Sequence, residues 1–143
     1  MHCMFLPLLP LLTALLVSVG VATASDKIDT SLIPSYILRG LEDYKAQGYA
    51  AAVRTWLADS PHEAATTLAS NLVVFKNIEM LAGKYRSHEV LLTQETPSSN
   101  LVYVRMNYER LPGYLLFVSQ KSEDRWVLAK IDLHRKQRLG QLH

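Results

Sequence analysis

The sequence predicts an α+β domain in which N-terminal helices pack on one face of a curved four-stranded antiparallel meander sheet. Two observations carry this prediction. Apolar residues recur at helical spacing between Pro34 and Gly83, whereas alternating runs rich in β-branched and aromatic residues follow Gly83. Short turn-forming segments separate the alternating runs, and short connections are typical of antiparallel hairpins.

The first 24 residues form an apolar leader, and all 15 basic and 13 acidic side chains lie in residues 25–143. The leader ends in Ala22-Thr23-Ala24, which is typical of a signal peptide with an A-x-A cleavage site. We therefore expect residues 1–24 to be removed and residues 25–143 to form one domain. The alternative is an inner-membrane anchor formed by residues 5–24, because about 20 apolar residues can span a bilayer.

Cysteine and charge bear on the compartment and the partners. The only cysteine is Cys3, so the exported part can form no disulfide. Small secreted eukaryotic domains usually carry disulfides, so we expect a periplasmic or secreted protein of the bacterial envelope. The net charge of +2 is too small to indicate nucleic-acid binding. The basic tail, residues 135–143, attracts a membrane only weakly, so we expect membrane contact only with an uncleaved leader.

The helical half begins after a polar stretch, residues 25–33, which we predict to be a disordered entry to the domain. Pro34 suits the first turn of a helix, and Gly48 is placed to end that helix. A second short apolar stripe runs from Tyr49 to Asp59. The residues that recur at helical spacing in the first helix are Ile37, Leu41 and Tyr44.

A third helix is predicted from Ser60-Pro61-His62-Glu63, which has the arrangement of a capping box. We expect about six turns, ending where Gly83 can adopt a left-handed conformation. Its inward residues are predicted to be Ala65, Leu68, Leu72, Phe75 and Ala82, flanked by Ile78 and Leu81. Four strands then follow, predicted at Ser87 to Thr96, Asn100 to Tyr108, Gly113 to Gln120 and Arg125 to His134.

A trial register with Tyr108 opposite Tyr114 and Gln120 opposite Arg125 divides the last three strands into two faces. The face expected under the helices carries Val102, Val104, Met106, Tyr108, Tyr114, Leu116, Val118, Val127, Ala129, Ile131 and Leu133. The outer face is expected to carry Leu101, Tyr103, Arg105, Asn107, Leu115, Phe117, Ser119, Trp126, Leu128, Lys130 and Asp132.

The outer face is more apolar than a solvated face needs to be. Aromatic side chains beside an arginine are typical of a partner interface. We therefore predict that this face binds a second subunit or another protein; the alternative is that curvature, the basic tail or the first strand covers it. The predicted interface residues are Tyr103, Arg105, Phe117, Trp126 and Leu128.

A family resemblance rests on the order of elements and on two segments. The segment from Gln47-Gly48-Tyr49-Ala50 to Trp56, and Asp124-Arg125-Trp126-Val127-Leu128 at the last strand, resemble the nuclear-transport-factor-two-like superfamily of cystatin-like α+β cones. Within it they resemble small exported bacterial proteins. The resemblance implies a pocket at the open end of the cone and dimerisation through the outer sheet face. Enzymes of the superfamily place an acidic base and a tyrosine or aspartic acid donor in the cone.

The expected function is therefore that of a non-enzymatic envelope binding or accessory protein. It would associate with itself or a partner through the outer sheet face, and could hold a small apolar ligand. Enzymatic activity is not favoured, because the helix-facing strand positions are almost all apolar. The predicted pocket residues are Tyr44, Tyr85, Tyr108 and Tyr114.

Two alternatives stay open: a small cone-pocket enzyme, isomerase- or dehydratase-like, and an immunity or inhibitor protein. The enzyme would need an ionisable group that reaches the pocket from a helix, with Tyr44 or Tyr85 as first candidates. No catalytic residue or cofactor is predicted. No metal site is predicted either, because the histidines have no second ligand at metal spacing. These scattered histidines are His62, His88, His134 and His143.

Overall fold

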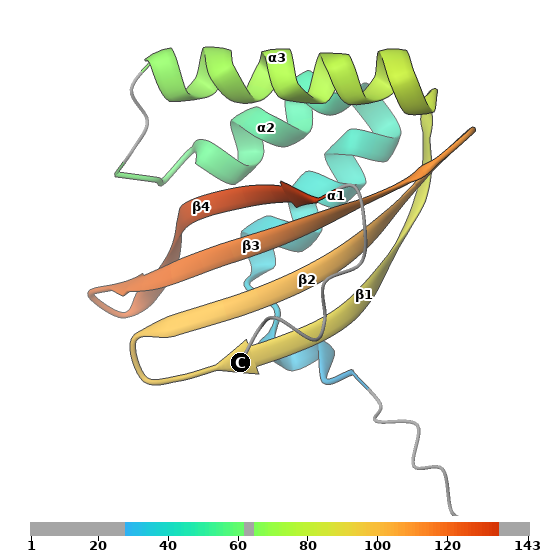
Figure 1. The fold of residues 1–143 in the computed structure, drawn as a ribbon. Coiled ribbons are helices and arrows are strands. Elements are labelled where there is room, and N and C mark those ends of the chain that lie inside the picture. Colours follow the sequence, from blue (N-terminus) through green and yellow to red (C-terminus); the bar gives the residue numbers. More distant parts are fainter. Residues whose placement is uncertain (1–27, 62–64, 135–143) are drawn as a thin grey trace, which may run out of the picture.

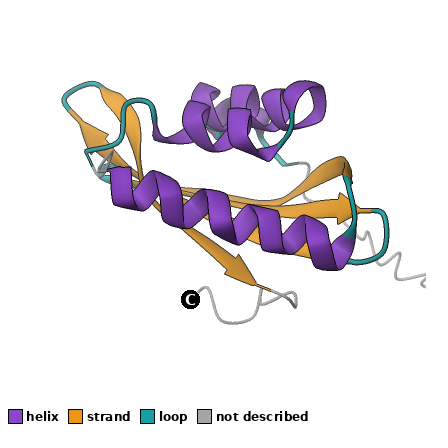
Figure 2. Ribbon diagram, turned by 90° about the horizontal axis from the view of Figure 1, so that it is seen from above, coloured by secondary structure: helices purple, strands orange, loops and turns teal. Residues whose placement is uncertain are grey.

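The computed structural model describes residues 28–61 and 65–134, and it confirms the α+β arrangement (Figure 1). The predicted leader and basic tail lie outside the described residues. The four strands form one antiparallel sheet in the order β1-β2-β3-β4. All three α-helices lie over the same face of this curved sheet (Figure 2). The elements are η1 (Thr30–Leu32), α1 (Ser35–Gln47), α2 (Tyr49–Leu57), α3 (Ala65–Ala82), β1 (Tyr85–Glu95), β2 (Ser99–Tyr108), β3 (Pro112–Ser122) and β4 (Arg125–His134).

The prediction of a disordered entry is wrong for residues 28–33, the part of that segment that the structure describes. η1 is a short 3₁₀ helix, capped by the Asp29 carboxylate, which accepts a hydrogen bond from the Ser31 amide at 2.9 Å. Ile33 is only 6% exposed and belongs to the core. The buried Asn100 side chain donates to the Leu32 carbonyl at 2.8 Å. Burial and this tertiary hydrogen bond order a segment whose local composition alone is polar.

Two glycines determine how α1 and α2 meet. Gly48 joins the helices with a φ of 94°, a left-handed conformation that glycine adopts at no steric cost. Gly40 lies under Trp56, and a Cβ built on it would be 1.9 Å from the indole nitrogen. The indole N–H donates to the Ile37 carbonyl at 3.2 Å. The missing side chain at position 40 therefore lets Trp56 lie directly against α1.

α3 ends as predicted at Gly83, which has a φ of 86° and donates its N–H to the Glu79 carbonyl at 2.9 Å. Its described part, Ala65–Ala82, has 18 residues, which is five turns. The predicted capping box extends into residues 62–64, outside the described residues. The Ser60 hydroxyl donates to the Leu128 carbonyl at 2.8 Å and so connects the start of this segment to β4.

The predicted register between β2 and β3 is wrong by three residues. Arg105 pairs with Tyr114, and Met106 pairs with Gly113. Because three is an odd number, the shift turns every β3 side chain to the face opposite to the predicted one. Leu115, Phe117 and Ser119, expected outside, therefore point toward the helices, and each is 0% exposed. Tyr114, Leu116 and Val118, expected under the helices, lie on the outer face.

β4 departs from regular alternation as well. The β3–β4 register shifts between Val118 and Ser119, so that Ser119 pairs with Leu128 while Phe117 pairs with Ile131. Leu128 and Ile131 then both pack into the core under the helices. A β-bulge of this kind inserts an extra residue into one strand and re-aims its side chains. Leu128, predicted on the outer face, is therefore an inner residue.

The centre of the core is aromatic. The Trp56 ring lies 5.6 Å from the Phe75 ring and 5.0 Å from the Phe117 ring, measured between centroids. All three side chains are at most 1% exposed. Aromatic pairs at this spacing contribute more than their buried area alone. α2, α3 and β3 are therefore joined through one cluster of rings.

Candidate functional site

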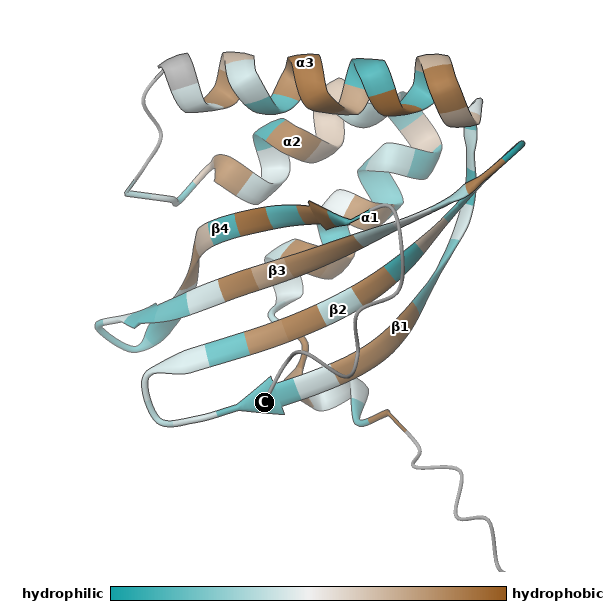
Figure 3. Ribbon diagram, viewed as in Figure 1, coloured by the Kyte–Doolittle hydropathy of each residue, from teal (hydrophilic) through white to brown (hydrophobic). Residues whose placement is uncertain are grey.

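The large apolar side chains that stay exposed within the described residues gather on or beside α3. Figure 3 shows α3 with strongly hydrophobic segments along a helix that forms the outermost layer of the molecule. Soluble monomers rarely leave large apolar side chains exposed together without a functional reason. The exposed large apolar residues are Val73, Val74, Met80, Leu81, Leu111 and Leu133.

A groove of about 470 Å³ runs between α3 and the ends of β3 and β4. Its walls are mainly apolar, and Asn77 and His134 are the polar side chains among the described lining residues. Such a volume lies within the range of roughly 300–1,000 Å³ that is usual for ligand pockets. The lining consists of Val74, Asn77, Ile78, Leu81, Ala82, Leu111, Pro112, Gly113, Leu133 and His134.

The wall formed by the β2–β3 loop is tied to the end of α3. The Arg110 amide donates to the Ala82 carbonyl at 2.8 Å, and its guanidinium donates to the carbonyls of Met80 and Leu81 at 3.0 and 3.2 Å. These bonds satisfy carbonyls that the end of a helix leaves without partners. The loop therefore holds Leu111 at the rim of the groove in a defined position.

Sequence reasoning did not predict this site. It treated Leu81 as a flank of the inward face and did not single out Val73, Val74 or Met80. The signal was present, because the apolar positions of α3 form two stripes on opposite sides of the helix. The "inner stripe" comprises Leu68, Leu72, Phe75, Glu79 and Ala82, and the "outer stripe" comprises Val73, Val74, Asn77, Met80 and Leu81.

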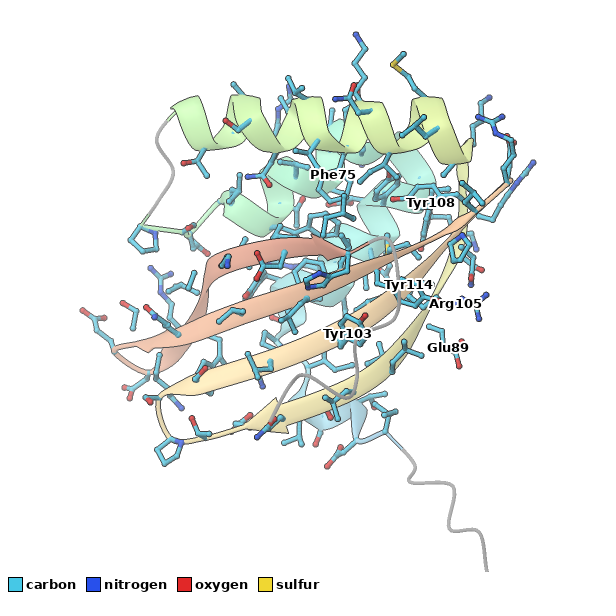
Figure 4. All side chains as sticks on the ribbon, viewed as in Figure 1. Phe75, Glu89, Tyr103, Arg105, Tyr108 and Tyr114 are labelled. Atoms are coloured by element: carbon cyan, nitrogen blue, oxygen red, sulfur yellow. The ribbon has the colours of Figure 1, made fainter. Side chains whose placement is uncertain are left out.

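Three of the four predicted pocket tyrosines come together beneath α3. The Tyr44 ring lies 4.5 Å from the Tyr85 ring and 6.3 Å from the Tyr108 ring. The Tyr44 and Tyr108 hydroxyls are 3.3 Å apart. Tyr114 does not join them, because the register places it on the outer face. There its ring stacks on the Tyr103 ring, with 6.0 Å between the ring centroids. Figure 4 labels Tyr108 close to the helices and Tyr114 lower on the strands.

Burial keeps these phenols neutral. It raises the pKa of Tyr85 to about 12, and it raises the pKa of Tyr44 and Tyr108 as well. The Tyr85 hydroxyl lies 2.7 Å from Nδ1 of His88, whose pKa is lowered by burial and then by Lys45. A neutral imidazole can accept the phenol proton in a hydrogen bond. The cluster is therefore an uncharged hydrogen-bonding group at neutral pH.

Glu79 is the acidic residue of this neighbourhood, and sequence reasoning missed it. The half-buried Glu79 side chain adds to the rise in the pKa of both Tyr44 and Tyr108, after the larger effects of burial and, for Tyr44, of the neighbouring Tyr108 hydroxyl. Its position could have been found from the sequence, because it follows Phe75 by four residues and so shares the inner stripe. A carboxylate close to two phenols is thus present under the helices.

The predicted outer-face interface is only partly on the outer face. Tyr103 and Arg105 lie there (Figure 4), while Phe117 and Leu128 are 0% and 2% exposed in the core beneath the helices. That part of the prediction is wrong, because the three-residue shift and the β-bulge turn both side chains inward. Trp126 is half-buried at the start of β4, where the Lys121 ammonium lies 4.9 Å from its ring centre.

Tyr103 itself is only 1% exposed, and its neighbours Tyr114 and Leu116 are 8% exposed. The Arg105 Nε atom is buried and has no hydrogen-bond partner in the described part of the chain. A role for Tyr103, Arg105 and Trp126 in partner binding stays a prediction. The exposed large apolar side chains of the described residues lie on α3 and beside it, at Leu111 and Leu133, and not on the outer face of the sheet.

Residues 28–61 and 65–134 contain neither a metal-binding cluster nor a membrane-spanning helix. Within these residues, no three His, Cys, Asp or Glu side chains are grouped so that they could hold a metal ion. None of the helices formed by these residues has the length and apolarity needed to cross a membrane.

Comparison with known proteins does not identify a family for the chain. No family model matches the chain, and no curated protein matches it. Among solved structures, the chain is similar to a DUF4783 family protein from Bacteroides uniformis, with 14% sequence identity and a TM-score of 0.49. The match covers 68% of this chain and 94% of that chain. Membership in the nuclear-transport-factor-two-like superfamily stays a prediction.

Proposed function

We propose that the chain is a non-enzymatic binding protein of the bacterial envelope that holds a small apolar molecule in the groove between α3 and the ends of β3 and β4. The observation that carries the proposal is the groove of about 470 Å³ with its mainly apolar lining. Burying apolar ligand surface there contributes roughly 25 cal/mol for each Å² removed from water.

The polar side chains of the lining indicate the class of ligand. The Asn77 amide can donate and accept hydrogen bonds, and so can a neutral His134 imidazole. A ligand with an apolar body and one polar end would therefore suit the groove. The rim residues Leu111 and Leu133 are 56% and 38% exposed without a ligand, so a bound molecule would cover apolar surface that now faces water.

The proposed compartment rests on the leader, and the proposed superfamily supports a pocket. An apolar run that ends in Ala22-Thr23-Ala24 is typical of export. Nuclear-transport-factor-two-like cones characteristically have a pocket at their open end, as the resemblance implies. Both points agree with a ligand-binding protein outside the cytoplasm, and both remain part of the proposal.

The test is a binding titration of the full chain with an environment-sensitive apolar fluorophore, followed by displacement with fatty acids of increasing length. We expect saturable binding that Leu111→Asp and Leu133→Asp each weaken by at least about tenfold, because a carboxylate at the rim must lose water when the ligand binds. Met80→Asp is the matched control, since Met80 is exposed on α3 but does not line the groove. Equal weakening by all three variants, or binding that does not saturate, would overturn the proposal.

A second candidate function rests on Glu79. A carboxylate beside the Tyr44 and Tyr108 phenols has the groups that a small isomerase- or dehydratase-like enzyme would need, a base and hydrogen-bond donors. Such an enzyme would abstract a proton next to a carbonyl group. The test is deuterium exchange into small ketones followed by NMR, with Glu79→Gln as the variant. Exchange that is no faster with the chain than without it would end this alternative.

A further inference from the structure

The outer stripe of α3 is apolar, although the fold of a single chain leaves it uncovered. Its other members lie three or four residues before or after Asn77, which places them on one side of the helix. Val73 is 57% exposed, Met80 is 68% exposed and Leu81 is 62% exposed. The inner stripe already accounts for the packing of α3 on the core, so the outer stripe needs a different explanation.

The outer stripe itself contains no charged residue, and Lys76, three residues after Val73 and four before Met80, lies at its border. Lys76 and Glu79 are the charged residues of the helix, and neither belongs to the outer stripe. An amphipathic helix that lies in a membrane surface usually carries several Lys or Arg beside its apolar side, whereas α3 has Lys76 alone. The composition therefore favours a protein partner over a lipid surface.

We infer that the outer stripe is a symmetric interface in which α3 packs antiparallel against α3 of a second copy of this chain. An antiparallel pair centred on Asn77 brings Val73 opposite Leu81 of the second copy, and Val74 opposite Met80 of the second copy. Each apolar side chain then meets an apolar side chain. The same patch serves both chains, as a two-fold interface requires.

Asn77 lies at the centre of this arrangement, where it faces Asn77 of the second copy. Each amide can donate to and accept from the other, so both can be satisfied at once. A single polar residue in an apolar helical seam fixes register and orientation at some cost in stability. Antiparallel packing also opposes the two helix dipoles, which is favourable.

The size of the patch agrees with this partner. The six exposed side chains on and beside α3 leave on the order of 600 Å² uncovered, which is the upper end of the largest patch on a typical monomer. Stable interfaces bury about 800 Å² of each partner. The outer stripe together with Leu111 and Leu133 therefore supplies most of the area that a specific dimer needs. Val74, Asn77, Leu81, Leu111 and Leu133 also line the groove, so a second copy and a ligand would compete for this surface.

The first test measures the mass of the full chain in solution by sedimentation velocity over a range of concentrations. We expect a monomer–dimer equilibrium whose Kd rises at least about 30-fold in Val73→Asp and in Met80→Asp, as for charged substitutions at the centre of an interface. Neither residue lines the groove, so both variants should still bind the apolar fluorophore. The inference therefore stands or falls separately from the proposed ligand site, and circular dichroism would verify that both variants are folded.

The second test checks the register. In a Cys3→Ser background, Asn77→Cys should form a disulfide-linked dimer on mild oxidation, because the two substituted positions face each other at the symmetry axis. Lys76→Cys is the matched control, since position 76 is exposed but lies off the stripe, and it should link at least about tenfold more slowly.

Three results would overturn the inference. The first is a chain that stays monomeric at the highest concentration, and the second is a dimer that persists unchanged in Val73→Asp and Met80→Asp. The third is a monomer whose outer stripe instead binds vesicles of anionic phospholipid, which would assign the stripe to a membrane surface. Equal cross-linking at positions 76 and 77 would overturn the proposed register.

Discussion

The two sides of α3 are similarly apolar but have opposite environments. On the inner side, Phe75 is 1% exposed, and its ring lies 5.9 Å from Tyr44 and 5.6 Å from Trp56. On the outer side, Met80 is 68% exposed and Val73 is 57% exposed. A helix that is hydrophobic all round is normally buried all round. Packing within one chain therefore explains the inner stripe only.

The largest expected change in the free energy of unfolding comes from the inner side of α3, and the matching change on the outer side should be small. Phe75→Ala should lower the free energy of unfolding by about 3–5 kcal/mol, because it leaves a cavity among aromatic rings that do not move to fill it. Met80→Ala should change it by less than about 0.5 kcal/mol in dilute protein, where a dimer would dissociate. Chemical denaturation of both variants provides the measurement. Comparable losses would show that the outer stripe is packed within the single chain.

The second-largest change in the free energy of unfolding is expected from overpacking the inner side, where α1 contacts Trp56. Gly40→Ala should lower the free energy of unfolding by about 2 kcal/mol, because overpacking at the Trp56 ring outweighs the roughly 1 kcal/mol that alanine returns in helix propensity. Trp56→Phe shortens the ring that the new Cβ would meet, so Gly40→Ala should cost less in that background. A double-mutant cycle measures the coupling, and additive losses would contradict the proposed contact.

The smallest change in stability is expected from His88, which contacts Tyr85 at the edge of the tyrosine cluster. The pKa of His88 is lowered from its ordinary value of 6.5 by burial, then by Lys45. As the pH falls below 6.5, the unfolded chain therefore takes up a proton that the folded chain resists, and stability decreases. His88→Gln should flatten this decrease, whereas Met80→Ala should leave its slope unchanged. Urea denaturation between pH 7.5 and about 5 would measure the pH dependence of stability in both variants. If His88→Gln leaves that slope unchanged, His88 is not the group that causes the decrease.

The elements themselves were predictable because their signals are local. Gly48 and Gly83 end helices at the expected positions, since each provides a left-handed conformation that other residues adopt at a cost. The predicted last strand, Arg125 to His134, has the bounds observed for β4. β1 begins at Tyr85, two residues before the prediction, and bounds of this kind depend on pairing that the local pattern does not contain.

The candidate site was not predictable to the same degree. Tyr44, Tyr85 and Tyr108 were expected together and do meet, because helical spacing and the β2 alternation place them on inward faces. Tyr114 was misplaced, since β3 is apolar on both faces and its pattern suits either register. The groove beside α3 joins residues far apart in the sequence, and only the folded chain brings Leu81 next to Leu111 and Leu133.

The division of the chain into helices and strands follows from local sequence patterns, because periodicity, glycine and turn residues act over a few neighbouring positions. The buried side of α3 follows from its inner stripe, which the helical spacing predicts, but the buried side of β3 does not follow from the local pattern. In β3 hydrophobicity is nearly equal on the two sides, so the choice depended on the fit of particular rings. Phe117 packs at 5.0 Å from Trp56 and thereby turns Leu116 outward, just as Phe75 turns Met80 toward water.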